Sequence, residues 1–287
     1  MLRAMAILSI QSAVAYGHVG NAAAVFPLQR LGFEVWRVDT VLFSNHTGYG
    51  AWRGQVLDPV LVGEILKGIE ERGAFPRCEA VLSGYLGSVH LGAVILDSVR
   101  AVKRANPHAL YACDPVMGDA EKGLYVQPDL PGFFRGRALP MADIVTPNQF
   151  ELENLSGKQV ATLAEARDAT NTLLSIGPRI LLVTSLTINE VPPDRIAMLT
   201  VTGEGGWLVA TPRLKVTANG AGDLTAALFL AHYLKTRDAA AALGATAASV
   251  HAVLAETLRS NAPELAIVAA QDSIAAPEHR FSVDKVF

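Results

Sequence analysis

The sequence predicts an α/β fold in which helices cover both faces of a central, mostly parallel sheet, with a small antiparallel part at its edge. Short apolar runs alternate with longer segments of helical periodicity, as in stacked βαβ units. The runs are apolar throughout, which is typical of strands that are buried on both faces. Of the 287 residues, 51% are hydrophobic and 18% are charged, so a large buried core is expected.

The apolar runs predict the strands of the parallel part of the sheet: Ala4–Ile10, Glu34–Val41, Ala80–Ser83, Leu110–Asp114, Asp143–Thr146 and Ile180–Thr184. Segments of helical spacing lie between them and predict the following helices: Asn21–Leu31, Pro59–Arg72, Ser88–Asn106, Asn148–Ser156 and Leu163–Ser175. Two long connections, 43–55 and 118–131, contain glycines. Long loops on an α/β scaffold are common places for binding sites, so both are candidates.

The pattern changes after Thr184, where an antiparallel strand pair and two alanine-rich helices are expected. Their bounds are Ile196–Val201, Trp207–Thr211, Ala221–Lys235 and Ala239–Ser260. No internal repeat and no linker rich in Pro, Gly or Ser interrupts the chain. We therefore expect residues 1–287 to form a single domain.

Charge and cysteine content exclude several classes of protein. The formal net charge is -3 without a basic run, so no nucleic-acid partner is expected. Cys78 and Cys113 lie far apart and form no CxxC pattern, which argues against a disulfide framework or a cysteine zinc site and favours the reducing cytoplasm. The apolar run at the N-terminus is far below the ~20 residues of a membrane span, so we expect a buried first strand and no membrane contact.

A glycine turn before a helix is the most informative local feature of the sequence. It reads Asn219-Gly220-Ala221-Gly222-Asp223 and is followed by apolar residues at helical spacing. The amides of Gly220, Ala221 and Gly222 can gather at the positive end of the helix dipole and bind a phosphate oxygen. Asp223 can then act as the base that takes a proton from a hydroxyl group. The alternative is that these residues only cap the helix.

A pair of carboxylates follows two neighbouring strands and is suited to magnesium. Asp114 ends one predicted strand, and Glu151 lies one unit later, three residues after Asn148. Thr146 with Gln149 predicts a capping box at this helix start. Magnesium that arrives with a nucleotide uses few carboxylates, so Asp114 and Glu151 are candidate ligands, directly or through water. The alternative is that Asp114 only ends a strand and Glu151 lies on a helix surface.

Other nucleotide-binding motifs are missing from the chain. It has no GxxxxGK[ST] sequence, no GxGxxG after the first strand, and no HRD or HExxH motif. Phosphate transfer by this chain would therefore need neither a P-loop nor the apparatus of a protein kinase.

Together these segments resemble the ribokinase-like kinases and, among them, the pyridoxal kinases. The resemblance covers nearly the whole chain, and its motifs are QSAVAYGHVGN, FSNHTGYG, SGYLGS, CDPVMGD, IVTPNQFELE and NGAGD. The first two are specific to pyridoxal kinases, whereas GAGD alone indicates only the superfamily. The resemblance implies a three-layer sandwich, ATP-dependent phosphorylation of the 5'-hydroxymethyl group of pyridoxal, Mg²⁺ with ATP, and a homodimer. A monovalent cation is a further candidate cofactor.

The resemblance also implies a role for each matching residue. Asp223 is the expected base, with the amides of Gly220, Ala221 and Gly222 as its anion hole. Ser12, just after the first strand, is expected to line the pocket for the pyridine ring together with Val19, Thr47, Gly48 and Tyr85. The residues expected on the nucleotide side are Asp114, Asn148, Glu151, Thr184, Thr211, Pro212, Arg213 and Leu214. His46 is expected to be a hydrogen-bonding residue of its loop rather than a proton-transfer group.

Two departures from the family pattern leave other functions open. Thr184 stands where some members have a lysine, and a lost cation near the ATP phosphates weakens nucleotide binding unless another group compensates. The segment 213–219 is also shorter than in some relatives. A hydroxymethylpyrimidine kinase or another ribokinase-like kinase would share the NGAGD-type site. A non-catalytic pyridoxal phosphate carrier is supported by Thr184 but opposed by the retention of Asp223 and both glycines.

Overall fold

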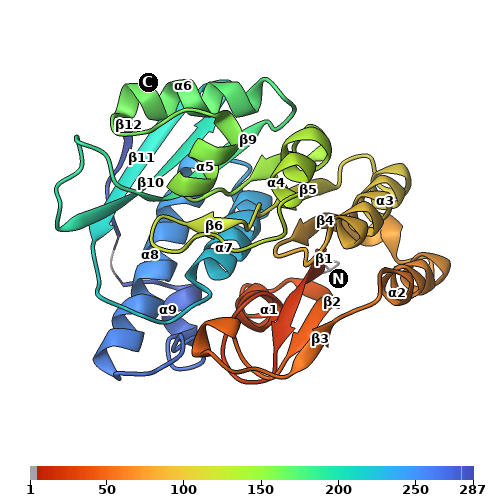
Figure 1. Ribbon diagram of the computed structural model, residues 1–287. Coiled ribbons are helices and arrows are strands. Elements are labelled where there is room, and N and C mark those ends of the chain that lie inside the picture. The colour runs from red at the N-terminus through yellow and green to blue at the C-terminus, as the bar shows by residue number, and fades with distance from the viewer. Residues whose placement is uncertain (1–4, 279) are drawn as a thin grey trace.

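The computed structural model describes residues 5–278 and 280–287, and its centre is one large sheet (Figure 1). The central strands pair in parallel. They are β1 (Ala6–Val14), β2 (Glu34–Phe43), β4 (Cys78–Ser83), β5 (Leu110–Cys113), β8 (Ile144–Val145) and β9 (Ile180–Leu186). Antiparallel strands complete both edges: β3 (Gly54–Val56) on one side, and β10 (Arg195–Thr202), β11 (Gly205–Pro212) and β12 (Val283–Lys285) on the other. The order is β12-β11-β10-β9-β8-β5-β4-β1-β2-β3.

Helices cover both faces of this sheet, so the molecule has three layers (Figure 1). One face carries α1 (Asn21–Arg30), α7 (Ala221–Thr236) and α8 (Ala239–Arg259), with the short α9 (Gln271–Ala275) beside them. The other face carries α2 (Pro59–Glu71), α3 (Val89–Ala105), α4 (Leu130–Phe133), α5 (Gln149–Ser156) and α6 (Leu163–Leu174). The expected three-layer α/β fold with a small antiparallel edge is confirmed, whereas the second antiparallel edge, formed by β3, was not predicted.

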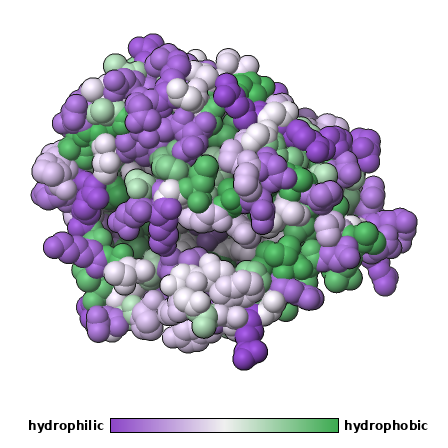
Figure 2. Space-filling view, in the orientation of Figure 1, coloured by the Kyte–Doolittle hydropathy of each residue, from purple (hydrophilic) through white to green (hydrophobic). Residues whose placement is uncertain are grey.

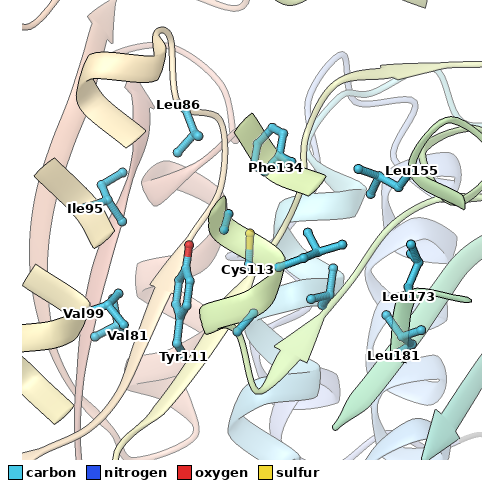
Figure 3. Close-up of a cluster of buried hydrophobic side chains, with 14 of the residues drawn as sticks. Val81, Leu86, Ile95, Val99, Tyr111, Cys113, Phe134, Leu155, Leu173 and Leu181 are labelled. Atoms are coloured by element: carbon cyan, nitrogen blue, oxygen red, sulfur yellow. The ribbon is translucent and has the colours of Figure 1, made fainter. Parts of the chain in front are cut away.

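Each face of the sheet has its own hydrophobic core because successive strand residues point in opposite directions. Leu181 belongs to the cluster under α3, α5 and α6, whereas Leu182 belongs to the cluster under α1, α7 and α8. Side chains of β4, β5 and β9 lie among those of α3, α5 and α6 (Figure 3). By length and composition alone α8 could cross a membrane, but half of it is buried, as in a core helix that packs on α7, β10 and β11.

The first strand differs from its prediction at both ends. Its expected start at Ala4 lies outside the described residues, and it continues past Ile10 to Val14. A register shift after Gln11 lets it go on pairing with β2, so that Ser12 lies opposite Val41. Ser12 is therefore inside β1 and not after it.

Several short elements were not predicted, because they are built from loops rather than from periodic segments. β3 lies in the first long connection, and a small hairpin, β6 (Gly118–Asp119) and β7 (Gly123–Leu124), lies in the second. α4, α9 and β12 were also missed. Single helical turns occur at Thr47–Tyr49, Phe75–Arg77, Phe134–Ala138 and Leu139–Met141.

The capping box of α5 is one step further along the chain than predicted. Asn148 has an extended backbone and is the N-cap: its side chain accepts from Glu151 N at 2.9 Å, and the Glu151 carboxylate accepts from Asn148 N at 2.9 Å. The pairing of Thr146 with Gln149 is thus wrong. The Thr146 hydroxyl instead donates to Asp114 Oδ1 at 3.0 Å, which joins the ends of two neighbouring strands.

Candidate active site

A cavity of about 440 Å³ opens at the carboxyl ends of the parallel strands. This is the edge at which open α/β sheets bind ligands. Its lining comes from β1, β2, the loops after β4, β5 and β8, the β6–β7 hairpin, β9 and the start of α7. Figure 2 shows a hollow near the middle of this face of the molecule.

The cavity brings together most of the residues that were predicted to form the site. The lining residues among them are Ser12, Val19, Thr47, Gly48, Tyr85, Asp114, Asn148, Glu151, Thr184, Gly220, Gly222 and Asp223. Ala221 lies between two of these as the first residue of α7. The remaining candidates are not part of the lining: Thr211 and Pro212 end β11, and Arg213 and Leu214 follow it.

The start of α7 forms an open cradle of backbone amides. The first hydrogen bond of this helix runs from Leu224 N to Gly220 O at 3.0 Å, so the amides of Ala221, Gly222 and Asp223 are not used by helix carbonyls. Gly220 has a φ of 92°, and a Cβ there would lie 1.8 Å from His18 O. A Cβ at Gly222 would meet nothing within 4 Å. The cradle therefore requires glycine at 220 for its shape and leaves free space at 222 for a ligand.

Asp223 lies half-buried in the first turn of α7 and faces the same cavity. Burial raises the pKa of its carboxyl group to about 6, although hydrogen bonds from the amides of Gly20 and of Asp223 itself oppose this. A carboxylate with such a pKa is ionised near neutral pH and is basic enough to accept a proton from an attacking hydroxyl group.

Asp114 and Glu151 are both buried, and no positively charged group is among the causes of their pKa shifts. Burial raises the pKa of Asp114 well above its usual range, and the charges of Glu151 and Asp223 raise it further. Burial also raises the pKa of Glu151 to about 7, against the effect of the amides of Asn148, Met117 and Gly118, which donate to it. Buried like charges of this kind favour the arrival of a cation.

The donor set at this point fits magnesium better than a metal with many protein ligands. Both Glu151 oxygens already accept amide hydrogens, whereas Asp114 uses Oδ1 to accept from Thr146. Within residues 5–278 and 280–287, no group of three or more His, Cys, Asp or Glu side chains could hold a metal ion. Magnesium that binds with nucleotide needs only one or two carboxylates and keeps several waters. Asp114 and Glu151 are the residues that would hold it, directly or through water.

The other end of the cavity can accommodate a flat ring. Val19, Val41 and Phe43 offer apolar surface, and Ser12, Thr47 and Tyr85 offer hydroxyl groups. His46 Nδ1 accepts from Gly48 N at 3.1 Å and caps the turn that carries Thr47. The prediction that His46 is a hydrogen-bonding residue of its loop is confirmed.

Glu264, which no sequence pattern indicated, fastens this end of the cavity. One carboxylate oxygen accepts from the Tyr49 hydroxyl group, and the other accepts from His18 N at 3.0 Å. The hydrogen bond to Glu264 raises the pKa of Tyr49 to about 12. Glu264 thereby connects the Thr47–Tyr49 turn with the segment that leads to Val19.

Other lining residues were also missed, among them Lys122, Tyr125 and Ser185. Lys122 and Tyr125 belong to the β6–β7 region, within a loop that had been marked only as a place for sites in general. Ser185, which follows Thr184, has a φ of 53°, and this backbone conformation is uncommon for residues other than glycine. No local sequence pattern predicts this conformation. Ser185 lies where the pairing of β9 with β10 shifts its register.

Comparison with known proteins identifies the family. Residues 75–266 match the family model described as phosphomethylpyrimidine kinase. The chain is 59% identical over 281 residues to pyridoxal kinase PdxY of Rubrobacter xylanophilus, covering 98% of this chain and 97% of that protein. It is 52% identical over 286 residues to PdxY of Deinococcus radiodurans, with 98% and 96% covered.

A solved structure gives the same result for the fold. Pyridoxal kinase from Leishmania donovani in complex with ADP and ginkgotoxin superposes with a TM-score of 0.92 at 28% identity, covering 99% of this chain and 100% of that one. The resemblance stated from the motifs is confirmed. The chain therefore belongs to the phosphomethylpyrimidine kinase family and, within it, to the pyridoxal kinases of the PdxY type.

Proposed function

We propose that this chain transfers the terminal phosphoryl group of ATP to the 5'-hydroxymethyl group of pyridoxal. The observation that carries the proposal is that Asp223 and the open amides of α7 share one cavity with Thr47 and Tyr85. The relatives PdxY of Rubrobacter xylanophilus and of Deinococcus radiodurans are named pyridoxal kinases, and the Leishmania donovani enzyme has been solved with ADP and pyridoxine.

The residues of the cavity divide the reaction between them. The amides of Ala221 and Gly222 hold oxygens of the transferred group, and the ring end of the cavity orients the alcohol toward it. The alcohol oxygen bonds to the terminal phosphorus while the bond from that phosphorus to the ADP oxygen breaks. The Asp223 carboxylate takes the proton of the alcohol.

Asp114 and Glu151 would hold Mg²⁺ beside the phosphates. The ion would neutralise charge on the phosphate oxygens. The two carboxylates that would hold the ion follow β5 and β8, whereas Ser12 of the ring pocket lies in β1.

A coupled assay of ATP consumption tests the proposed function. Pyridoxal, pyridoxine, pyridoxamine and hydroxymethylpyrimidine are supplied separately, and we expect turnover with pyridoxal. The name of the matching family model makes hydroxymethylpyrimidine the proper competitor. Turnover with hydroxymethylpyrimidine alone would replace the proposed substrate, and binding of pyridoxal without ATP consumption would indicate a carrier.

The two glycines of the cradle are expected to respond differently to alanine. Gly220→Ala should lower the free energy of unfolding by about 1–2 kcal/mol or more, because alanine is strained at positive φ and its methyl group would meet His18 O. Gly222→Ala should leave the melting temperature unchanged but raise KM for ATP by roughly tenfold, because its methyl group enters the cavity. Thermal unfolding and steady-state kinetics of both variants distinguish the two effects. Equal behaviour of the variants would contradict them.

Removal of the Glu264 carboxylate is expected to weaken the binding of pyridoxal selectively. Glu264→Ala should raise KM for pyridoxal roughly tenfold, because the hydrogen bonds to Tyr49 and His18 are both lost. KM for ATP should stay unchanged. Tyr49→Phe removes only one of these bonds and is expected to have a smaller effect. A change in KM for ATP alone would refute this role of Glu264.

The homodimer implied by the family resemblance has a candidate surface in this structure. Large apolar side chains are exposed on the edge strand β3 and on the adjacent α2, namely Val56, Val60, Leu61 and Ile65. We propose that a second copy of the chain covers them, because large apolar side chains that gather on an exposed surface often mark a protein–protein interface. Light scattering should report a dimer for the wild type and a monomer for the Leu61→Glu/Ile65→Glu double variant. A dimeric double variant would exclude this surface.

We also propose that the chain acts as a single kinase domain in a reducing cytoplasm. Both cysteines are buried free thiols, and burial raises the pKa of Cys78 to about 11 and that of Cys113 to about 12. Buried thiols that stay protonated are unreactive and form no disulfide, which is typical of proteins in a reducing compartment.

A further inference from the structure

The cavity has an unusual balance of charge for a site that receives ATP. Its lining contains the carboxyl groups of Asp114, Asp119, Glu151 and Asp223. By the family resemblance, Thr184 stands where some members have a lysine. Among the described residues 5–278 and 280–287, the lining includes one lysine, Lys122, and no arginine. Within that part of the chain, Lys122 is the one lysine or arginine side chain that a triphosphate entering this cavity would meet in its lining.

Lys122 is held at this place by the turn of the β6–β7 hairpin. Asp119 Oδ1 accepts from Lys122 N at 2.7 Å and from Glu121 N at 3.0 Å, so the backbone of the turn is fixed from inside. Gly118 at its base is packed so closely that an added Cβ would lie 2.3 Å from Gly123 O. The shape of this turn is therefore well defined.

The base of the hairpin is fastened to the residues that are suited to Mg-ATP. Asn148 Nδ2 donates to Gly118 O at 2.8 Å, and Met117 N donates to Glu151 Oε1 at 2.8 Å. The capping box of α5 thus fixes the position of the hairpin as well as that of the buried carboxylate. Any phosphate beside Asp114 and Glu151 comes close to this hairpin.

The tip of the hairpin lines the cavity with Lys122. Lys122 lines the same cavity as His46, Thr47 and Gly48. Burial lowers the pKa of His46, and the charge of Lys122 lowers it further. Lys122 is exposed, and in the part of the chain that the structure describes its ammonium group forms no ion pair. The group is therefore free to bind an anion that enters between the hairpin and the start of α7.

We propose that Lys122 binds the terminal phosphate oxygens of ATP and supplies the positive charge that Thr184 lacks. This rests on the proposed function for the identity of the nucleotide. A lysine ammonium group is a mobile point charge on a long stem, so it can follow the phosphoryl group from ATP toward the alcohol. Lys122 is thus a residue of the phosphate site that the start of α7 only partly provides.

Nucleotide binding by variants of Lys122 tests this proposal without any catalytic turnover. Calorimetry with Mg²⁺ compares a non-hydrolysable ATP analogue with ADP, because only the former carries the terminal phosphate. Lys122→Met should weaken the analogue by about 10- to 100-fold, as expected for the loss of a hydrogen bond between charged groups, and should affect ADP much less. Lys122→Arg should keep most of the affinity. Lys67→Met, on the exposed face of α2 away from the cavity, is the matched control and should bind as the wild type does.

A rescue experiment tests the link to Thr184. Adding Thr184→Lys to Lys122→Met should restore at least about fivefold of the lost affinity, because it returns a cation to the same cavity. No rescue would overturn the claim that the two positions supply one charge. Equal loss of ADP and of the analogue, or a loss in Lys122→Arg as large as in Lys122→Met, would overturn the terminal-phosphate contact and indicate a role in hairpin shape. If the wild type binds the analogue but does not phosphorylate pyridoxal, the proposed function is refuted, whereas the contact between Lys122 and the terminal phosphate is not.

Discussion

Replacement of Asp223 by asparagine is expected to lower the turnover number by ~100-fold or more, the range for a positioned general base. Asparagine has nearly the same shape and can still accept the hydrogen bond from the Gly20 amide, but it cannot take the proton of the alcohol. Steady-state kinetics measures the loss. Calorimetry should find that the affinities for pyridoxal and for the ATP analogue are largely kept. Turnover near that of the wild type would refute the role of Asp223.

The same carboxylate predicts the acid side of the pH profile. Its pKa of about 6 means that the basic form predominates above pH 6 and is lost as the pH falls through that value. Below it, kcat/KM for pyridoxal should fall about tenfold for each pH unit. A profile that stays flat down to pH 5 would show that no group with this pKa is required.

Removal of magnesium is expected to abolish phosphate transfer. Excess EDTA leaves the phosphates of ATP without the cation that Asp114 and Glu151 would hold, and the buried carboxylates would then repel the phosphates. Added Mg²⁺ should restore the activity in full, which controls for irreversible damage. Asp114→Asn should raise the Mg²⁺ concentration that gives half-maximal rate. Activity that persists in excess EDTA would remove the proposal for this pair.

Much of the fold could be predicted because its strands and helices carry strong periodic signals. The buried strands are short apolar runs such as Leu110–Cys113, and helices such as α7 and α8 are long and alanine-rich. The glycine turn before α7 was also readable, because a φ of 92° at Gly220 demands a residue without a side chain. In these cases local sequence and tertiary structure agree.

The rest depends on contacts between segments that are distant in sequence. Glu264 follows α8 and nevertheless fastens Tyr49, more than two hundred positions earlier, so no local pattern announces it. The hairpin that carries Lys122 is held by Asn148 and Glu151, not by strong strand propensity of its own. The N-cap of α5 was misplaced because Thr146, a good capping residue, is instead engaged by Asp114.

The close packing of Gly220 against His18 O has a consequence for how this scaffold can acquire new substrates. The peptide that leads into the ring pocket and the turn that receives phosphate touch backbone to backbone, so neither can shift alone. The Thr47–Tyr49 turn, by contrast, is joined to Glu264 through the Tyr49 side chain. We therefore expect adaptation to another heterocycle to occur most easily by substitution of residues 46–49. A change in the backbone of segment 18–20 would require a matching change at position 220.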